Sequence, residues 1–168
     1  NKDTYSRAVS DGGTYKWKYD VEYVVYKYNG NAIMAAIGLA QLPRLDTDNA
    51  YRRQMAQWYT DGFKPYSDVI KLVETPAECE SAQHLFQILV EDRDGLLAYL
   101  NQHEIFPGVH YIDNIEYRMY RYADGTCPKA RYASDHILSL PLHMRLTRED
   151  VQKVVDTVIE YLVNPKKA

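Results

Sequence analysis

The chain has 168 residues, which suits one globular domain and is short for two. Hydrophobic residues make up 46% and charged residues 26% of it, and this composition excludes intrinsic disorder as the main state. The 20 Lys and Arg against 23 Asp and Glu give a net charge of -3, so no overall positive field would attract nucleic acid.

Two further observations concern location and cysteine chemistry. The sequence has no run of about 18 apolar residues and no apolar stretch after its polar start, so we expect neither a membrane span nor a signal peptide. A soluble, cytoplasmic protein without a membrane partner follows. The absence of an initiator Met indicates a fragment or a processed product. Cys79 and Cys127 have no second Cys or His at ligand spacing, so we expect no disulfide framework and no zinc site.

The first predicted element is extended. Between Tyr15 and Tyr23, aromatic and apolar residues alternate with charged ones, the period of two that is typical of a strand with one covered face. A turn follows at Asn29 and Gly30, where positive φ is tolerated. We expect a helix to start near Asn31.

That helix is predicted to be interrupted. Small apolar residues continue at helical spacing after Asn31, but Pro43 would kink or split the helix. A second segment is expected from about Asp46 through Trp58, ending before Asp61 and Gly62.

The middle of the chain is predicted to supply the sheet. A short strand is expected at Val69 to Val73, and the nearly all-apolar run from His84 to Val90 predicts a central strand covered on both faces. Asp92 and its neighbours would cap a helix that ends near His103. Ile105 to Tyr111 is interpreted as another strand.

The last third is predicted to be helical. Cys127 to Leu138 has apolar residues at helical spacing, with Pro128 in the first turn. Thr147 and Asp150 would cap a final helix whose apolar stripe is Val151, Val154, Val155, Val158, Ile159 and Leu162. Strands separated by helices of this length indicate an α/β or α+β fold.

Few residues indicate chemistry by themselves. The five histidines have no pair spaced for a metal site on a helix. His110 follows Gly108 at the end of a predicted strand, where a side chain can reach a cleft, although a structural histidine is the alternative. Cys127 has no identifiable base beside it, which favours a structural residue over a nucleophile. The sequence thus predicts a domain that contributes to a site without holding all of it.

Six blocks in the same order resemble a known family. They are Tyr26–Asn29, Ala35–Leu42, Phe86–Val90, Gly108–Tyr111, Ser139–His143 and Leu146–Val151. Together they resemble the C-terminal part of the pyridoxal-phosphate-dependent sugar aminotransferases called the DegT/DnrJ/EryC1/StrS family. The resemblance covers the chain from Tyr19 onward.

The resemblance implies a type I aminotransferase fold, in which a large domain holds the cofactor and a small sheet packed against helices forms the C-terminal αβ domain. Residues 1–30 would then be an extended connecting segment from the missing large domain, and residues 31–168 the small domain. The family's dimers share each site between subunits, so a homodimer is expected.

The implied activity is transfer of an amino group to a keto group of a nucleotide-linked deoxysugar, in polysaccharide or antibiotic sugar biosynthesis. Glutamate is the expected amino donor. The full-length parent would use pyridoxal phosphate. No lysine in this sequence matches the family's cofactor-binding motif, so we expect no catalytic residue here, no covalently bound cofactor and no activity of the chain alone.

The resemblance also assigns candidate residues. Lys27 and Asn29 match the turn that reaches the cofactor phosphate of the neighbouring subunit. His110 matches a histidine near the sugar nucleotide, and Tyr111 and Tyr117 follow it in a segment that approaches the substrate. Two alternatives stay open: a stand-alone, non-catalytic binding or oligomerising domain, and a dehydratase in which another residue replaces the lysine.

Overall fold

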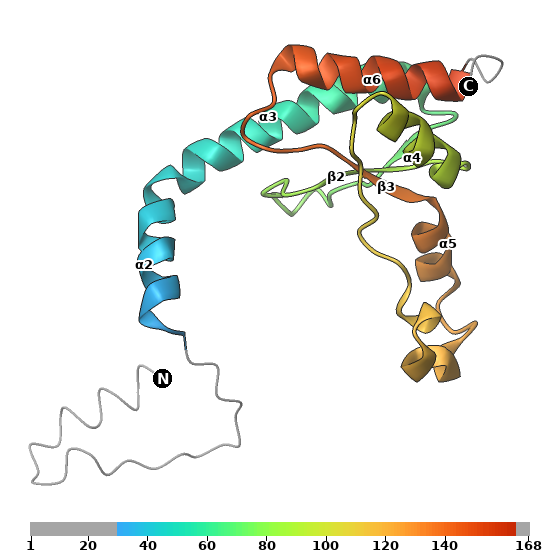
Figure 1. Cartoon of the computed structure of the whole chain (residues 1–168), viewed down its shortest axis with the longest axis horizontal. Coiled ribbons are helices and arrows are strands. Elements are labelled where there is room, and N and C mark those ends of the chain that lie inside the picture. Colours follow the sequence, from blue (N-terminus) through green and yellow to red (C-terminus); the bar gives the residue numbers. More distant parts are fainter. Residues whose placement is uncertain (1–29, 164–168) are drawn as a thin grey trace, which may run out of the picture. The chain divides into compact units, whose positions relative to one another are not determined.

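The computed structural model describes residues 30–163. The strand predicted between Tyr15 and Tyr23 and the candidate residues Lys27 and Asn29 lie outside this range. The chain divides into two units, one ending at Gln41 and the other beginning at Leu42 (Figure 1). The domain boundary expected after residue 30 stays a prediction.

The first unit contributes helix α2 (Ala32–Gln41). Asn31 caps it, because the side-chain oxygen of Asn31 accepts a hydrogen bond from the Met34 N–H at 2.9 Å. The predicted helix start near Asn31 is therefore confirmed. No residue of α2 is charged and all of its residues are exposed. An apolar helix without a polar face is typical of a helix buried in a larger assembly.

Pro43 interrupts the helical path as predicted. The elements around it are η1 (Leu42–Arg44), a single 3-10 turn, then α3 (Leu45–Phe63) and a second 3-10 turn, η2 (Lys64–Tyr66). The predicted end of α3 before Asp61 is wrong. Gly62 lies inside the helix and against α6, where a β-carbon would come within 2.8 Å of Val155 Cγ1. Gly62 thus permits close helix packing and does not end the helix.

Three short strands form one antiparallel sheet in the order β1 (Lys71–Leu72), β2 (Phe86–Leu89) and β3 (Ile137–Leu140). The strand predicted within Val69 to Val73 and the central place of β2 are confirmed. Burial alternates along β2, however: Phe86 and Ile88 are buried, whereas Gln87 and Leu89 are half-buried. The prediction that β2 is fully covered on both faces is wrong, and its alternation is typical of antiparallel sheets.

Three helices follow β2 in the chain: α4 (Arg93–Gln102), α5 (Pro128–His136) and α6 (Arg148–Val163). The Asp92 carboxylate caps α4 by accepting the Gly95 N–H at 3.1 Å. At α6 the Thr147 N–H donates to the Asp150 carboxylate at 2.9 Å, and the Asp150 N–H donates to Thr147 Oγ1 at 3.2 Å. Both predicted caps are confirmed, and the second is a reciprocal capping box.

Two predicted elements differ from the structure. Ile105 to Tyr111 is not a strand, since only an isolated bridge between Gly108 and Ser139 forms there. The predicted helix from Cys127 to Leu138 ends at His136, because the apolar residues after it pair with β2 as strand β3. Two 3-10 segments lie between α4 and α5: η3 (Asn114–Glu116) and η4 (Arg118–Ala123).

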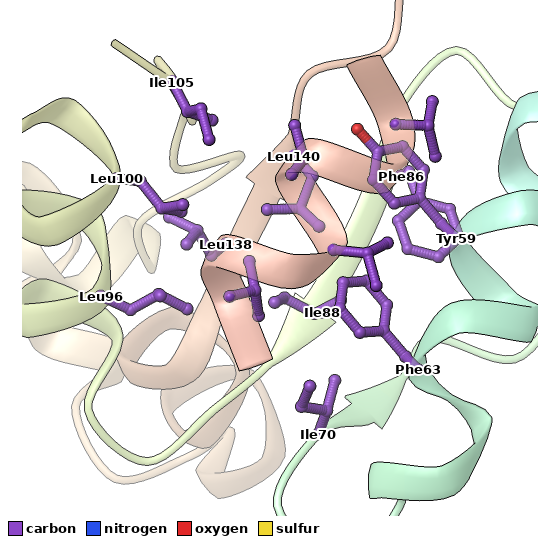
Figure 2. Close-up of a cluster of buried hydrophobic side chains, with 14 of the residues drawn as sticks. Tyr59, Phe63, Ile70, Phe86, Ile88, Leu96, Leu100, Ile105, Leu138 and Leu140 are labelled. Atoms are coloured by element: carbon purple, nitrogen blue, oxygen red, sulfur yellow. The ribbon is translucent and has the colours of Figure 1, made fainter. Parts of the chain in front are cut away.

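The core lies between one face of the sheet and helices α3, α4 and α6 (Figure 2). The ring of Tyr59 stacks on Phe86 with centroids 4.8 Å apart, and Phe63 lies 6.4 Å from the same ring. The Tyr59 hydroxyl donates to the Pro141 carbonyl at 2.9 Å, so it keeps a partner although burial raises its pKa. A small sheet packed against helices is the predicted α+β architecture, which is confirmed.

Candidate functional site

The second face of the sheet carries polar side chains. Gln87 of β2 and Ser139 of β3 are directly opposite each other in the antiparallel register. Cross-strand partners project from the same face of a sheet, so both side chains lie opposite the apolar face that Phe86 and Ile88 turn to the core. The face turned away from the core therefore carries the polar pair Gln87 and Ser139 beside the half-buried apolar pair Leu89 and Ile137.

The segment after α4, yellow in Figure 1, meets β3 at one isolated bridge between Gly108 and Ser139. The Gly108 N–H donates to the Ser139 carbonyl at 3.0 Å, and the Ser139 N–H donates to the Gly108 carbonyl at 2.7 Å. This pair of bonds fixes the backbone two residues before His110. His110 was predicted to stand at the end of a strand, but the structure has only this isolated bridge there, so His110 follows a single bridge and not a strand.

His110 is held at three points. Its Nδ1 lies 3.0 Å from Ser139 Oγ, and its backbone carbonyl accepts a hydrogen bond from Gln87 Nε2 at 2.6 Å. Its ring covers Gly108 so closely that a β-carbon at that position would lie 2.6 Å from Cε1. The imidazole is thus oriented by Ser139, Gln87 and Gly108 and is half-buried.

The candidate tyrosines differ in their relation to His110. The ring of Tyr111 stands edge-on to the imidazole with centroids 5.1 Å apart, and the side chain is 75% exposed. Tyr117 is 50% exposed, and within residues 30–163 no ring contact joins it to His110. The structure therefore brings together His110 and Tyr111 but not Tyr117.

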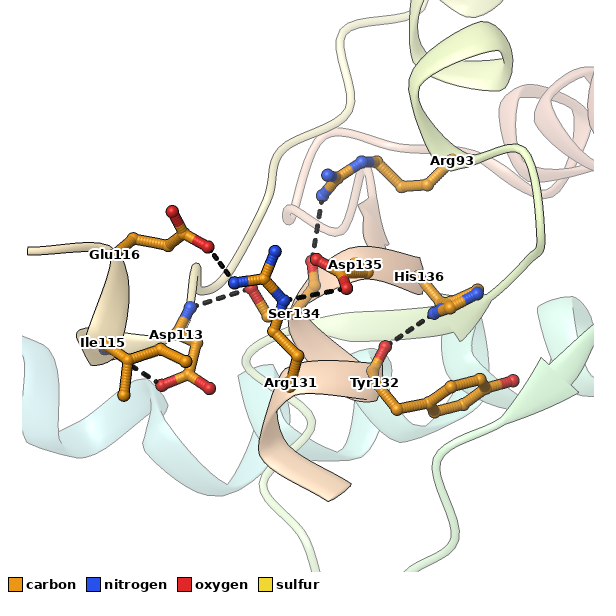
Figure 3. Close-up of polar contacts among 9 residues, drawn as sticks. All are labelled: Arg93, Asp113, Ile115, Glu116, Arg131, Tyr132, Ser134, Asp135 and His136. Atoms are coloured by element: carbon orange, nitrogen blue, oxygen red, sulfur yellow. Dashed lines mark hydrogen bonds and ion pairs between the residues drawn. The ribbon is translucent and has the colours of Figure 1, made fainter. Parts of the chain in front are cut away.

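Polar contacts tie the segment that carries these tyrosines to α5 (Figure 3). The Asp113 N–H donates to Ser134 Oγ at 2.8 Å, and the Asp113 carboxylate accepts the Ile115 N–H at 3.2 Å. Arg131 of α5 forms ion pairs with Glu116 and Asp135. Hydrogen bonding to Asp135 is the main cause that raises the Arg131 pKa. The segment after His110 is therefore anchored to α5 at Asp113 and at Glu116.

The hollows of the surface lie away from His110. One of about 490 Å³ lies between α4 and α6 and is lined by Asp92, Tyr99 and Tyr161 among others. Its carboxylate is already engaged, since Asp92 accepts the Tyr161 hydroxyl and the Gly95 N–H; the first of these bonds raises the pKa of Tyr161 to about 12. A second hollow of about 330 Å³ is lined by Ile115, Glu116, Arg121, Asp124 and Arg131. In each hollow two of the lining side chains already pair with each other: Asp92 with Tyr161 in the first, and Glu116 with Arg131 in the second.

The lysines of the described residues share one feature. All lysines between residues 30 and 163 are exposed: Lys64, Lys71, Lys129 and Lys153. A lysine that forms a covalent adduct is typically activated by burial or by a neighbouring cation, and these four lack burial. The same range holds no grouping of His, Cys, Asp and Glu suited to a metal, and Cys79 and Cys127 are exposed thiols. No helix in it is long and apolar enough to cross a membrane.

Comparison with known proteins decides the family. The sequence profile of the DegT/DnrJ/EryC1/StrS aminotransferase family matches residues 3–159. The chain belongs to this family. It is 28% identical over 172 residues to the spore coat polysaccharide biosynthesis protein SpsC of Bacillus subtilis, a match that covers 94% of this chain and 42% of SpsC.

Solved structures of the family share its fold. Sugar aminotransferase CalS13 from Micromonospora echinospora is 27% identical with a TM-score of 0.73, over 83% of this chain and 38% of CalS13. DesV of S. venezuelae is 26% identical with a TM-score of 0.72, over 83% of this chain and 41% of DesV. The predicted type I aminotransferase fold is confirmed. The chain spans about two fifths of the length of the relatives it matches.

Proposed function

We propose that this chain is the C-terminal part of a pyridoxal-phosphate-dependent aminotransferase that transfers an amino group from glutamate to a keto group of a nucleotide-linked deoxysugar. The family match over residues 3–159 supports the class of reaction, and the likeness to CalS13 supports a sugar substrate. A solved PLP form of Spr1654, a similar protein from Streptococcus pneumoniae, supports pyridoxal phosphate as the cofactor. SpsC, by its name, acts in polysaccharide biosynthesis, and we extend polysaccharide or antibiotic sugar biosynthesis in the cytoplasm to this chain as part of the proposal.

The observation that carries the role of this chain is the fixation of His110. A histidine whose ring nitrogen and carbonyl are both held by side chains of the sheet, and whose ring lies against Gly108, is pre-oriented to bind a ligand without further ordering. His110 would bind a polar atom of the sugar nucleotide, and the exposed ring of Tyr111 beside it would cover a sugar or base face. Tyr117 would contact the substrate further from His110.

In the proposed enzyme, a large domain upstream of this chain binds the cofactor. Bound pyridoxal phosphate supplies the electron sink that amino transfer requires. The exposed lysines of residues 30–163 do not fit its covalent attachment, so we assign this chain no catalytic residue. Lys27 and Asn29 would hold the cofactor phosphate of the partner subunit, which makes a homodimer part of the proposal.

The experiment uses the complete protein that contains this chain together with its upstream sequence. Supplied with pyridoxal phosphate, glutamate and a nucleoside-diphosphate keto-deoxysugar, it should form 2-oxoglutarate and the corresponding amino sugar, detected by mass spectrometry. The 168-residue chain is the matched control: after borohydride reduction none of its lysines should carry a pyridoxyl group.

Three results would contradict the proposal. Loss of water from the sugar without amino transfer would favour the dehydratase. Binding of the sugar nucleotide with no turnover, or a complete protein that begins near residue 1, would favour a stand-alone binding or oligomerising domain. A pyridoxyl group on a lysine of the 168-residue chain would place the covalent anchor here.

A further inference from the structure

The two nitrogens of the His110 imidazole have different surroundings. Nδ1 lies 3.0 Å from Ser139 Oγ, whereas Nε2 has no hydrogen-bond partner among residues 30–163. Ser139 is only 3% exposed, so water does not compete for its hydroxyl. One nitrogen is therefore used by the fold and the other is left for a ligand.

The direction of the bond between Ser139 and His110 follows from the partners of Ser139. Its backbone N–H and carbonyl are both bonded to Gly108, and His110 Nδ1 is the single side-chain partner of its hydroxyl in the described part of the chain. If Nδ1–H donated to Oγ, the buried hydroxyl hydrogen would have no acceptor, which is unfavourable. The hydroxyl therefore donates and Nδ1 accepts.

We propose that Ser139 is the positioning residue of His110: its buried hydroxyl donates to Nδ1, fixes the Nε2–H tautomer and makes His110 a hydrogen-bond donor toward its ligand. The neutral imidazole has one donor and one acceptor nitrogen, so fixing Nδ1 as the acceptor decides the chemistry of Nε2. This inference rests on the proposed function and specifies it, because a donor selects an acceptor oxygen of the sugar nucleotide, such as a phosphate or carbonyl oxygen.

Two neighbours keep this arrangement rigid. Gln87, opposite Ser139 in the sheet, holds the His110 backbone through the carbonyl at 2.6 Å. Gly108 leaves room for the imidazole, which a side chain at that position would displace. The ring can therefore keep its bond to Ser139 without moving the strand.

The tautomer is tested directly by nitrogen-15 NMR of the imidazole in the 168-residue chain, at a pH well above the ordinary imidazole pKa. The wild-type spectrum should show His110 with its proton on Nε2. Ser139→Ala should give a mixture of tautomers, and Ser139→Thr, which keeps a hydroxyl, should restore the Nε2–H form. A proton on Nδ1 in the wild-type chain, or an unchanged tautomer in Ser139→Ala, would overturn the proposal.

Ser134→Ala is the matched control, because Ser134 is also a buried serine but its Oγ accepts the Asp113 N–H. It should leave the His110 tautomer unchanged. Backbone amide signals of Gly108 and Ser139 report whether each variant keeps the bridge. The wild-type spectrum alone decides the direction of the bond even if a variant does not fold.

Activity of the complete protein separates this inference from the function it rests on. Ser139→Ala should raise KM for the nucleotide sugar about three- to tenfold, the range expected for one lost neutral hydrogen bond, and should leave cofactor retention unchanged. If His110 carries its proton on Nε2 but His110→Ala does not change KM, His110 does not bind the substrate. The hydrogen bond from Ser139 to the ring would still be confirmed. If His110→Ala changes KM and Ser139→Ala does not, His110 binds the substrate without needing Ser139 to orient it, and the positioning role of Ser139 is wrong.

Discussion

The imidazole of His110 lies against the α-carbon of Gly108, where a β-carbon would come within 2.6 Å of Cε1. The backbone at Gly108 lies outside the left-handed region, so any residue could adopt it. Glycine is therefore required at this position to make room for the histidine ring, and not to allow an unusual backbone conformation.

Gly108→Ala should displace the imidazole from Ser139 and destabilise the chain by about 1–3 kcal/mol, the usual range for overpacking. Urea unfolding measures the stability, and the nitrogen-15 spectrum of His110 reports the displaced ring. Gly30→Ala is the control, since nothing lies within 4 Å of a β-carbon there and Gly30, like Gly108, lies outside the helices. Equal effects of the two substitutions would show that the contact between Gly108 and His110 carries no energy.

Gly62 of α3 should show the same kind of coupling with Val155 of α6. Gly62→Ala should destabilise by about 1–3 kcal/mol although Ala is the better helix former by about 1 kcal/mol, because its β-carbon meets both methyl groups of Val155. In a Val155→Ala background the added methyl should be neutral or stabilising. Unfolding of the two single variants and the double variant measures the coupling, and strictly additive values would contradict the close contact.

The cap of α6 predicts a dependence of stability on pH. Hydrogen bonds from the backbone and then the hydroxyl of Thr147 lower the pKa of Asp150. Because the folded pKa is below the unfolded one, the stabilisation by the carboxylate is present above the ordinary carboxyl pKa and is lost as the pH falls through the folded value. Asp150→Ala should therefore be less stable than wild type near neutral pH, and this stability gap should be smaller at about pH 3, below the ordinary carboxyl pKa.

Thr147→Ala provides the companion measurement, since it removes the hydroxyl donor to Asp150 but keeps the backbone N–H donor, and loss of the cap should cost about 1 kcal/mol. Chemical unfolding at both pH values tests the two variants together. A stability gap between wild type and Asp150→Ala that persists undiminished in acid would assign the effect to helix propensity instead of the carboxylate.

The exposed apolar helix α2 predicts self-association of the 168-residue chain. Ile33, Ile37 and Leu39 are each more than half exposed on a helix without any charge. Such a patch associates with another apolar surface when no other part of the protein covers it. Light scattering should show species larger than a monomer, and a variant with Ile33→Lys and Leu39→Lys should shift the population toward monomer. A wild-type monomer over a wide concentration range would contradict this expectation.

Local signals in the sequence predicted the N-terminal ends of three helices correctly. Asn31, Asp92 and Thr147 cap the helices that were expected at those residues, because a cap depends on side chains within one turn. Gly62 misled the prediction, since glycine is common at helix ends but here serves a contact with α6 that lies far away in the sequence. No local pattern distinguishes these two uses.

The sheet and the site were predicted only in part. Ile137 to Leu140 continues the apolar spacing of the preceding helix, and pairing with β2 decides that it is a strand. His110 was recognised, but Ser139 and Gln87 were not, because their role depends on cross-strand register. One signal was present: Ser139 is the single polar residue in an apolar run, and a buried serine requires a hydrogen-bond partner.

The most direct test of the proposed function compares Asn29→Ala and His110→Ala in the complete aminotransferase that contains this chain. Two quantities are measured for each variant: the Kd of pyridoxal phosphate and kcat/KM for the nucleotide sugar. Loss of one hydrogen bond to the charged phosphate should weaken cofactor binding in Asn29→Ala about ten- to a hundredfold, from about 1.5–3 kcal/mol. His110→Ala should keep the cofactor and lower kcat/KM. Equal small effects on both quantities would return both residues to a structural role, and loss of cofactor from the His110 variant alone would contradict the account.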